Sequence, residues 1–158
     1  MAGWEGGDYL DRPLRDLLSD IAGAEPVPAA GSTVAGTTAL AAALTAKVAR
    51  RSRRADAAEL AARADLLRTR VEAGVAADAA AYADVLSTPR DERDPEAAAH
   101  WPRTVRETAS ELAGLARDLA DNGNPNLRYD AEAAARLATV SSEIAESLLR
   151  ANASLTPP

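Results

Sequence analysis

Residues 33–52, TVAGTTALAAALTAKVARRS, decide the fold class of this chain. The stretch has no charged side chain before Lys47 and consists almost entirely of Ala, Thr, Val, Leu and Gly. A helix that is apolar on every side is usually buried among neighbouring helices rather than lying on a surface. We therefore expect these residues to form the central helix of a helical protein, with Ser32 as its N-terminal cap.

Periodic apolar positions predict four more helices around the central one. The first, with Pro13 in its first turn, has apolar positions at Leu10, Leu14, Leu17, Leu18 and Ile21. A long helix from about Asp56 to Leu86 has them at Leu60, Leu67, Val71, Val75, Tyr82 and Val85. The next, entered through or kinked at Pro102, has them at Val105, Leu112, Leu115 and Leu119. The last is expected to bury Leu137, Val140, Ile144 and Leu148.

Three breaks separate these helices. Residues 23–31 contain two prolines and two glycines, residues 87–95 contain two prolines among charged side chains, and residues 122–126 read Asn-Gly-Asn-Pro-Asn. Proline cannot continue a helix, whereas Gly and Asn accept the backbone angles at which helices end. No segment shows the period-two alternation of a strand. The sequence predicts an all-α, Ala-rich, up-and-down bundle of about five helices, forming one domain over residues 1–158.

The composition predicts how such a bundle is stabilised. Hydrophobic residues make up 47% of the 158, but aromatic residues only 3%, and there is no Phe. Alanine supplies roughly a quarter of the chain, far above ordinary usage. Because small side chains bury little area each, the helix backbones must approach closely and a subunit interface should add stability. We expect a homodimer.

Charge and composition also argue against several classes of function. The net charge of −6 and the pI near 4.8 disfavour a nucleic-acid partner, which would call for a basic surface. Without Cys and with a single His, neither a disulfide framework nor a metal site is expected. Residues 1–7 do not resemble a signal peptide, and no apolar run is long enough to span a membrane. We expect a cytoplasmic protein without a bound cofactor.

Asp78 is the first candidate for chemistry. It lies between Val75 and Tyr82 at the spacing that places all three on one stripe of the long helix. A carboxylate on an inward-facing stripe is costly to bury, and burial raises its pKa toward neutrality, where it can exchange protons. The alternative is a structural aspartate at the edge of the core, paired with one of the arginines.

The turn at residues 123–126 is the second candidate. Gly123, Asn124, Pro125 and Asn126, with Asp130 close behind, gather amide and carboxylate groups at one end of the bundle. Such groups can orient a polar ligand. The alternative is purely structural: the turn ends one helix, and Asp130 caps the next by accepting hydrogen bonds from its backbone.

Two further groups are weaker candidates. Gly31 and Ser32 precede the central helix, whose N-terminal amides can bind an anion or a polar ligand edge, or the two residues simply form a tight turn with a cap. Arginines at 50, 51, 53 and 54 can bind carboxylates, or can complement the C-terminal end of the helix dipole on a solvated face.

Together these residues resemble the cyclodeaminase/cyclohydrolase family, which includes the C-terminal domain of formiminotransferase-cyclodeaminase. The family's Pro-x-Pro-Gly-Gly-Gly-Ser turn is similar to residues 26–32, PVPAAGS, and its Asp-x-x-Ala-Phe/Tyr signature matches residues 78–82, DAAAY. Its Gly-Asn-Pro-Asn-x-x-x-Asp signature matches residues 123–130 without departure. A proline before that motif and a late asparagine are similar in position to Pro102 and Asn152.

The resemblance implies a folate one-carbon enzyme. Members either close formiminotetrahydrofolate to methenyltetrahydrofolate with release of ammonia, or open the methenyl ring with water. It implies that Asp78 acts as general acid and base or stabilises the cation, that Asp130 is a second carboxylate across the pocket, and that a reduced folate is the substrate. It further implies substrate-binding roles for other residues, namely Gly31, Ser32, Tyr82, Asn124, Asn126, Arg53 and Arg54.

Departures from the family pattern leave two other readings open. Two of the three turn glycines are replaced by Ala29 and Ala30, and the stretch after the central helix is rich in Arg instead of Lys. One alternative is a member whose cyclisation or hydrolysis acts on a substrate other than folate. The other is a helical interaction module without catalytic activity.

Overall fold

The computed structural model describes residues 8–153, apart from the side chain of residue 95, and within them it contains five α-helices and no strand. The helices are α1 Leu14–Ile21, α2 Ala30–Arg50, α3 Ala57–Ser87, α4 Pro95–Asn122 and α5 Arg128–Ala153. Single 3-10 turns occupy Tyr9–Asp11, Arg90–Glu92 and Pro125–Leu127. The all-α class is confirmed. None of the described helices has the length and apolar character that a membrane span requires.

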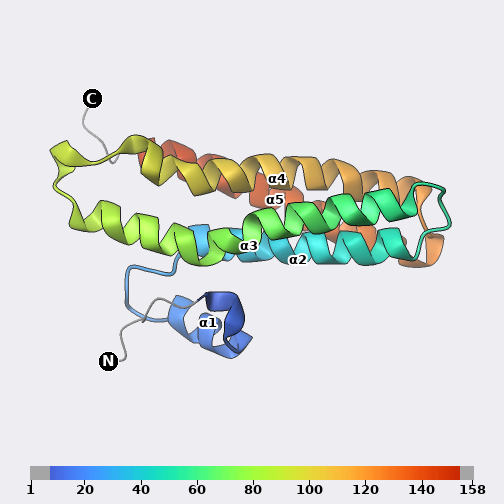
Figure 1. Cartoon of the computed structure of the whole chain (residues 1–158), viewed down its shortest axis with the longest axis horizontal. Coiled ribbons are helices and arrows are strands. Elements are labelled where there is room, and N and C mark those ends of the chain that lie inside the picture. The colour runs from blue at the N-terminus through green and yellow to red at the C-terminus, as the bar shows by residue number, and fades with distance from the viewer. Residues whose placement is uncertain (1–7, 154–158) are drawn as a thin grey trace.

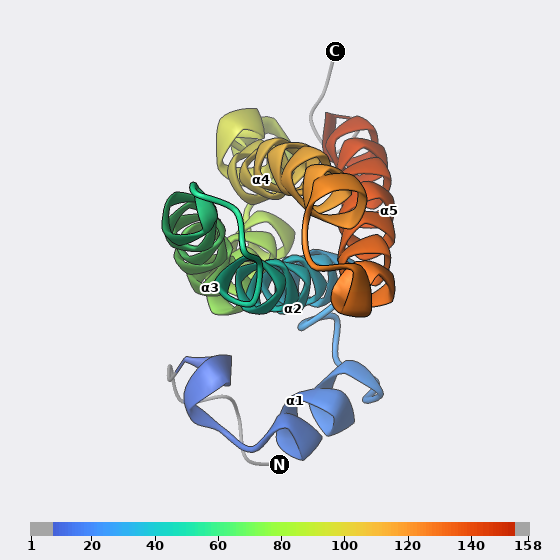
Figure 2. The ribbon, with the colours of Figure 1, turned by 90° about the vertical axis from the view of Figure 1, so that its right-hand side faces the viewer.

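Four of the helices, α2 to α5, lie side by side as an up-and-down bundle (Figures 1 and 2). The connections α2–α3 and α4–α5 lie together at one end of the bundle, and the α3–α4 connection lies at the other end, beside the C-terminal end of α5. Helix α1 stands apart from the bundle in both views. The prediction of five bundled helices is therefore right for four of them.

Helix α1 begins later than the sequence predicts. Asp8 caps a 3-10 turn at Tyr9–Asp11, and α1 starts only after Pro13. Of the predicted apolar positions, Leu17 is buried, whereas Leu14 is 64% exposed and Leu18 is 58% exposed. Tyr9 and Leu17 connect this segment to the bundle through the cluster that contains Val34 and Val75. The predicted spacing of apolar residues in α1 is correct, but most of the apolar side of this helix is not covered by other described residues.

Alanine lines the contacts of the central helix, as its sequence predicts. Ala41, Ala42, Ala46 and Ala49 of α2 have no exposed surface, and α2 contacts α3, α4 and α5. A methyl side chain adds little thickness between two helix axes, so the backbones can approach closely and pack at the density of a protein interior. One side of α2 is nevertheless not buried: Leu40 in its middle is 66% exposed, and Thr33 and Ala43 are exposed as well.

The predicted buried face of α5 is wrong. Leu137, Val140 and Ile144 are 41%, 51% and 40% exposed, and Leu148 is only partly buried. The face that packs inward is instead made of small side chains, namely Ala131, Ala134, Ala135, Ala138, Ser141 and Ala145. Helix α5 therefore has two apolar stripes, one of large and one of small side chains. Because the helices of the bundle lie close together, the stripe of small side chains is the one that packs inward.

Two neighbouring leucines on α3, one buried and one exposed, test whether the buried side of this helix supplies its stability. Leu67 is 1% exposed and Leu66 is 58% exposed, so the same substitution probes buried and exposed positions in one helix. Leu67→Ala should lower the free energy of unfolding by about 2–5 kcal/mol, because it leaves a cavity. Leu66→Ala should change it by less than about 0.5 kcal/mol. Urea unfolding followed by circular dichroism measures both, and equal losses would contradict the packing described.

Candidate functional site

Asp78 points from α3 toward the N-terminal end of α2. Its carboxylate lies directly against Gly31, where any Cβ would overlap both carboxylate oxygens. The side chain is partly buried, and no described residue forms a hydrogen bond or ion pair with it. The inward orientation predicted from the stripe between Val75 and Tyr82 is therefore present. The alternative, an aspartate paired with an arginine, is wrong for the described residues.

Burial raises the pKa of Asp78 from 3.8 to about 6, because the surrounding protein removes water from the charged form. No cation or donor among the described residues offsets that loss of water. A carboxyl group with a pKa near 6 exists in both protonation states close to neutral pH, so it can accept a proton and return it within one reaction cycle.

The cavity beside Asp78 is small. Its volume is about 10 Å³, which has room for about one water molecule. Besides Asp78 it is lined by Ala81, Tyr82, Ala97, Ala98, Trp101 and Asn152. Four elements therefore meet around the carboxylate: the N-terminal end of α2, the second half of α3, the first turns of α4 and the last turn of α5.

Two of these residues were not assigned a site role from the sequence. The indole of Trp101 packs so closely on Gly74 that an added Cβ would lie 2.8 Å from the ring. Asn152 donates a hydrogen bond from Nδ2 to the carbonyl oxygen of Ala98 at 2.8 Å, which joins the end of α5 to the start of α4. In the sequence, the feature that indicates a large side chain packed on α3 is Gly74, which lies one helical turn before Asp78.

The Gly-Asn-Pro-Asn turn lies at the other end of α2. Asn124 donates from Nδ2 to the carbonyl oxygen of Arg51 at 2.9 Å and accepts from the backbone N–H of Asn126 at 3.0 Å. Asp130 does not cap α5 but lies 3.5 Å from Lys47 Nζ. Since α2 contains 21 residues, its two ends are about 30 Å apart. The expectation that Asp78, Asn124 and Asp130 share one cavity is therefore wrong for a single chain.

The remaining predicted site residues divide between these two ends. Gly31 and Tyr82 lie with Asp78. Ser32 follows Gly31 in the chain, but it is fully buried with no hydrogen-bond partner among the described residues. Because α2 has no side-chain cap, the prediction that Ser32 caps the helix is wrong. Arg53 is exposed at the Asn124 end.

Arg54 is already fully engaged at that end. Its guanidinium pairs with Asp56 at 2.8 Å and with Asp118 at 2.5 Å. Asp56 stands at the start of α3 and Asp118 lies on α4, so Arg54 joins the α2–α3 connection to α4 and has a structural role instead of a free binding one.

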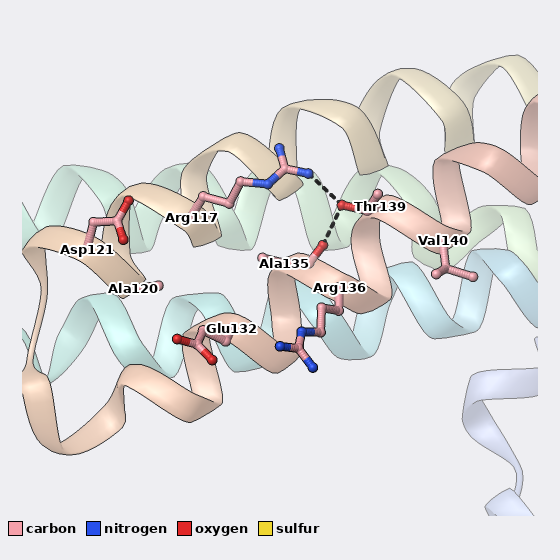
Figure 3. A pocket seen from close by; sticks show the side chains of 8 residues that line it. All are labelled: Arg117, Ala120, Asp121, Glu132, Ala135, Arg136, Thr139 and Val140. Atoms are coloured by element: carbon pink, nitrogen blue, oxygen red, sulfur yellow. Dashed lines mark hydrogen bonds between the residues drawn. The ribbon is translucent and has the colours of Figure 1, made fainter.

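A larger hollow of about 450 Å³ lies between α4 and α5, away from Asp78 (Figure 3). Arg117 of α4 donates to the hydroxyl of Thr139 at 2.7 Å, and that hydroxyl donates to the carbonyl oxygen of Ala135 at 2.8 Å. Arg136 points away from this pair. The walls carry both Arg and acidic side chains and lack a buried titratable group, so the hollow is a weaker candidate than Asp78.

The fold and the site together define an all-α bundle with a partly buried carboxylate, unpaired among the described residues, near a helix N-terminus. The sequence profile of the formiminotransferase-cyclodeaminase family matches residues 13–156. The chain belongs to this family.

Comparison with solved structures supports the fold assignment. The chain is similar to the formiminotetrahydrofolate cyclodeaminase of Thermotoga maritima, with a TM-score of 0.85 and 21% sequence identity. The likeness covers 93% of this chain and 81% of that one. No curated protein sequence matches the chain.

Replacing Asp78 with Asn tests the burial of the carboxylate through the pH dependence of stability. The folded-state pKa, about 6, lies above the unfolded value of 3.8, so the folded state binds the proton more tightly. The stabilisation from protonation is complete below the unfolded pKa and is lost as the pH rises through the folded pKa. Between about pH 4 and pH 7 the wild type should lose about 1–3 kcal/mol of unfolding free energy relative to Asp78→Asn. Urea unfolding across that range measures the difference, and a constant difference would show a solvated carboxylate.

Gly31→Ala tests the contact between α2 and Asp78. The new methyl group must displace the carboxylate toward water, so the pKa of Asp78 should fall toward its ordinary range, which carbon-detected NMR titration of the carboxyl group measures. Gly36→Ala is the matched control, because its Cβ would have an ordinary 4.0 Å contact with Val75. An unchanged pKa in Gly31→Ala would contradict the contact.

Proposed function

We propose that the protein is a folate one-carbon enzyme that acts on the amidine-like carbon of a reduced folate, as a formiminotetrahydrofolate cyclodeaminase or a methenyltetrahydrofolate cyclohydrolase. The observation that carries this proposal is the carboxylate of Asp78, held against Gly31 with no cation or donor from residues 8–153 beside it. Membership of the formiminotransferase-cyclodeaminase family supplies the class of substrate. The likeness to the Thermotoga maritima enzyme supports the scaffold.

In the cyclodeaminase direction, one proton has to move between two nitrogens. N10 of the folate attacks the carbon of the protonated, cationic formimino group, which forms a tetrahedral centre bonded to N5, N10 and an amino group, with the positive charge and the proton now on N10. Asp78 takes the proton from N10 and gives it to the amino group, whose bond to carbon then breaks. Ammonia leaves, and the methenyl cation keeps the single positive charge. A carboxyl group with a pKa of about 6 can perform both transfers near neutral pH.

In the cyclohydrolase direction, the same carboxylate activates water. Asp78 takes a proton from the water that adds to the methenyl carbon and returns one to the nitrogen whose bond breaks. The second proton of the water goes to solvent, so the cationic substrate gives a neutral formyl product and a proton. In both directions the ionised form of Asp78 also stabilises the positive charge spread over the carbon and its two nitrogens.

Other residues have supporting roles in this proposal. Tyr82 lines the cavity with Asp78 and offers an aromatic face to a pteridine ring. Arg53, exposed and unpaired among the described residues, is the cation that we assign to a glutamate carboxylate, although in one chain it lies at the opposite end of α2 from Asp78. Gly31 keeps Asp78 in position.

The altered turn does not favour a non-catalytic module. Ala29 and Ala30, which replace two family glycines, are both exposed, and neither is the residue against which Asp78 lies. Gly31, the glycine that the turn retains, is the one whose missing side chain the carboxylate requires.

Turnover of two folates by the wild type and Asp78→Asn tests the proposal. Purified protein should form methenyltetrahydrofolate from formiminotetrahydrofolate or consume methenyltetrahydrofolate, and methenyl absorbance follows either reaction. Asp78→Asn should lower kcat at least about 100-fold, because Asn cannot transfer protons. The rate limb near pH 6 that ionisation of Asp78 produces should disappear in the variant.

Asp84→Asn is the matched control, since Asp84 is an exposed aspartate on the same helix. It should keep the wild-type rate and pH profile. Wild-type protein that neither binds nor converts either folate would contradict the proposal, as would an Asp78→Asn variant with unchanged kcat.

A further inference from the structure

Pro102 lies in the interior of α4 and is buried. A proline has no backbone N–H, so it cannot donate to the carbonyl oxygen four residues earlier in an α-helix. In α4 that carbonyl belongs to Ala98, which is 8% exposed and so has little access to solvent. A buried carbonyl without its helical donor has to find another partner, or the fold is destabilised.

Asn152 supplies the missing donor. Its Nδ2 donates to the carbonyl oxygen of Ala98 at 2.8 Å, from the last turn of α5. Asn152 and Ala98 both line the cavity that contains Asp78. The carbonyl that Pro102 leaves free is therefore the point at which the end of α5 is attached to α4, in the wall of the Asp78 cavity.

Another contact between the same two helices shows how this one differs. Ser142 on α5 donates from Oγ to the carbonyl oxygen of Arg106 on α4 at 3.3 Å. Four residues after Arg106, α4 has Ser110, whose N–H is available to that carbonyl, so Ser142 adds a second and longer bond. Asn152 instead makes a shorter bond to a carbonyl that α4 itself leaves without the donor four residues on.

The turn of α4 from Ala98 to Pro102 is also fixed to α3. The indole of Trp101 packs on Gly74, which lies one helical turn before Asp78, and Trp101 lines the cavity as well. This one turn of α4 is thus held to α5 through a hydrogen bond and to α3 through an aromatic contact. Both attachments meet at the Asp78 cavity.

We propose that Pro102 and Asn152 form a positioning pair for Asp78. Pro102 removes the helical donor of the Ala98 carbonyl, and Asn152 binds that carbonyl from α5, which closes the cavity wall over the carboxylate. Helix ends open most easily, and α5 ends one residue after Asn152, so the bond fixes a turn that would otherwise admit water. Both residues act through the surroundings of Asp78, by excluding water from it.

The other groups around the cavity carry little charge. Tyr82 is the other titratable residue that lines it, and the residue of α2 against Asp78 is the uncharged Gly31. His100 is exposed and contacts Trp101 edge-on, with ring centroids 5.1 Å apart. Burial raises the pKa of Asp78 to about 6, so this pKa reports how well the wall excludes water.

A double-mutant cycle followed by urea unfolding tests the pair. Asn152→Ala leaves the Ala98 carbonyl without a partner and should raise the unfolding equilibrium constant about 5- to 30-fold. In a Pro102→Ala background the substituted residue has an N–H for that carbonyl, so Asn152→Ala should raise the constant less than about 3-fold. Equal effects of Asn152→Ala in both backgrounds would overturn the pairing.

Ser142→Ala is the matched control for the cycle. It also removes a hydrogen bond from α5 to a carbonyl of α4, but the Arg106 carbonyl keeps its helical donor. It should raise the unfolding constant less than about 3-fold in either background.

Titration of Asp78 tests its positioning without any substrate. Carbon-detected NMR should show that Asn152→Ala lowers the pKa of Asp78 from about 6 toward 3.8, because water enters through the opened wall. Ser142→Ala should leave this pKa at about 6. An unchanged pKa of Asp78 in Asn152→Ala would overturn the positioning role.

The effect on turnover rests on the proposed function. Asn152→Ala should lower kcat about 10-fold and move the rate limb near pH 6 to lower pH, whereas Ser142→Ala should keep the wild-type rate and limb. An active wild type whose rate limb stays in place in Asn152→Ala would overturn the positioning role and leave the proposed function intact. A wild type inactive on both folates would contradict the proposed function, and the titration would still decide the role of Asn152.

Discussion

The close approach of helices along the alanines of α2 is the constraint on which the rest of this structure depends. Buried methyl groups at Ala41, Ala42, Ala46 and Ala49 leave space for backbones but not for large side chains. Large apolar residues are consequently displaced from the interior of α5 and the middle of α2 to the outer face. The same packing that stabilises the bundle thus creates an apolar surface that a single chain leaves exposed.

The burial of Asp78 lowers the stability of the folded protein when this side chain is ionised. An aspartate held away from water, with no hydrogen-bond donor or cation among the described residues, destabilises the ionised state of the folded protein. The contact with Gly31 shows how closely it is confined, because one added carbon at that position would occupy the space of the carboxylate. Under the proposed function, this loss of stability is the usual compromise between folding and activity. In this bundle the loss is confined to one side chain in a cavity of about 10 Å³.

The spacing of apolar residues and the positions of turn-forming residues predict part of this structure. The bounds of α3, the inward direction of Asp78 and the breaks between helices follow from spacing and from Pro, Gly and Asn. The buried face of α5 could not be predicted, because Leu137 and Ala138 belong to two different apolar stripes of this helix, and only the distance between helices decides which stripe packs inward. Ser32 is likewise a residue type that commonly caps helices, but α2 begins before it, at Ala30.

The separation of the two motifs follows from topology. The turn at residues 123–126 joins α4 to α5 at the end where α2 meets α3, whereas Asp78 lies 21 residues into α3. A sequence motif records which residues are needed together but not whether one chain supplies them all.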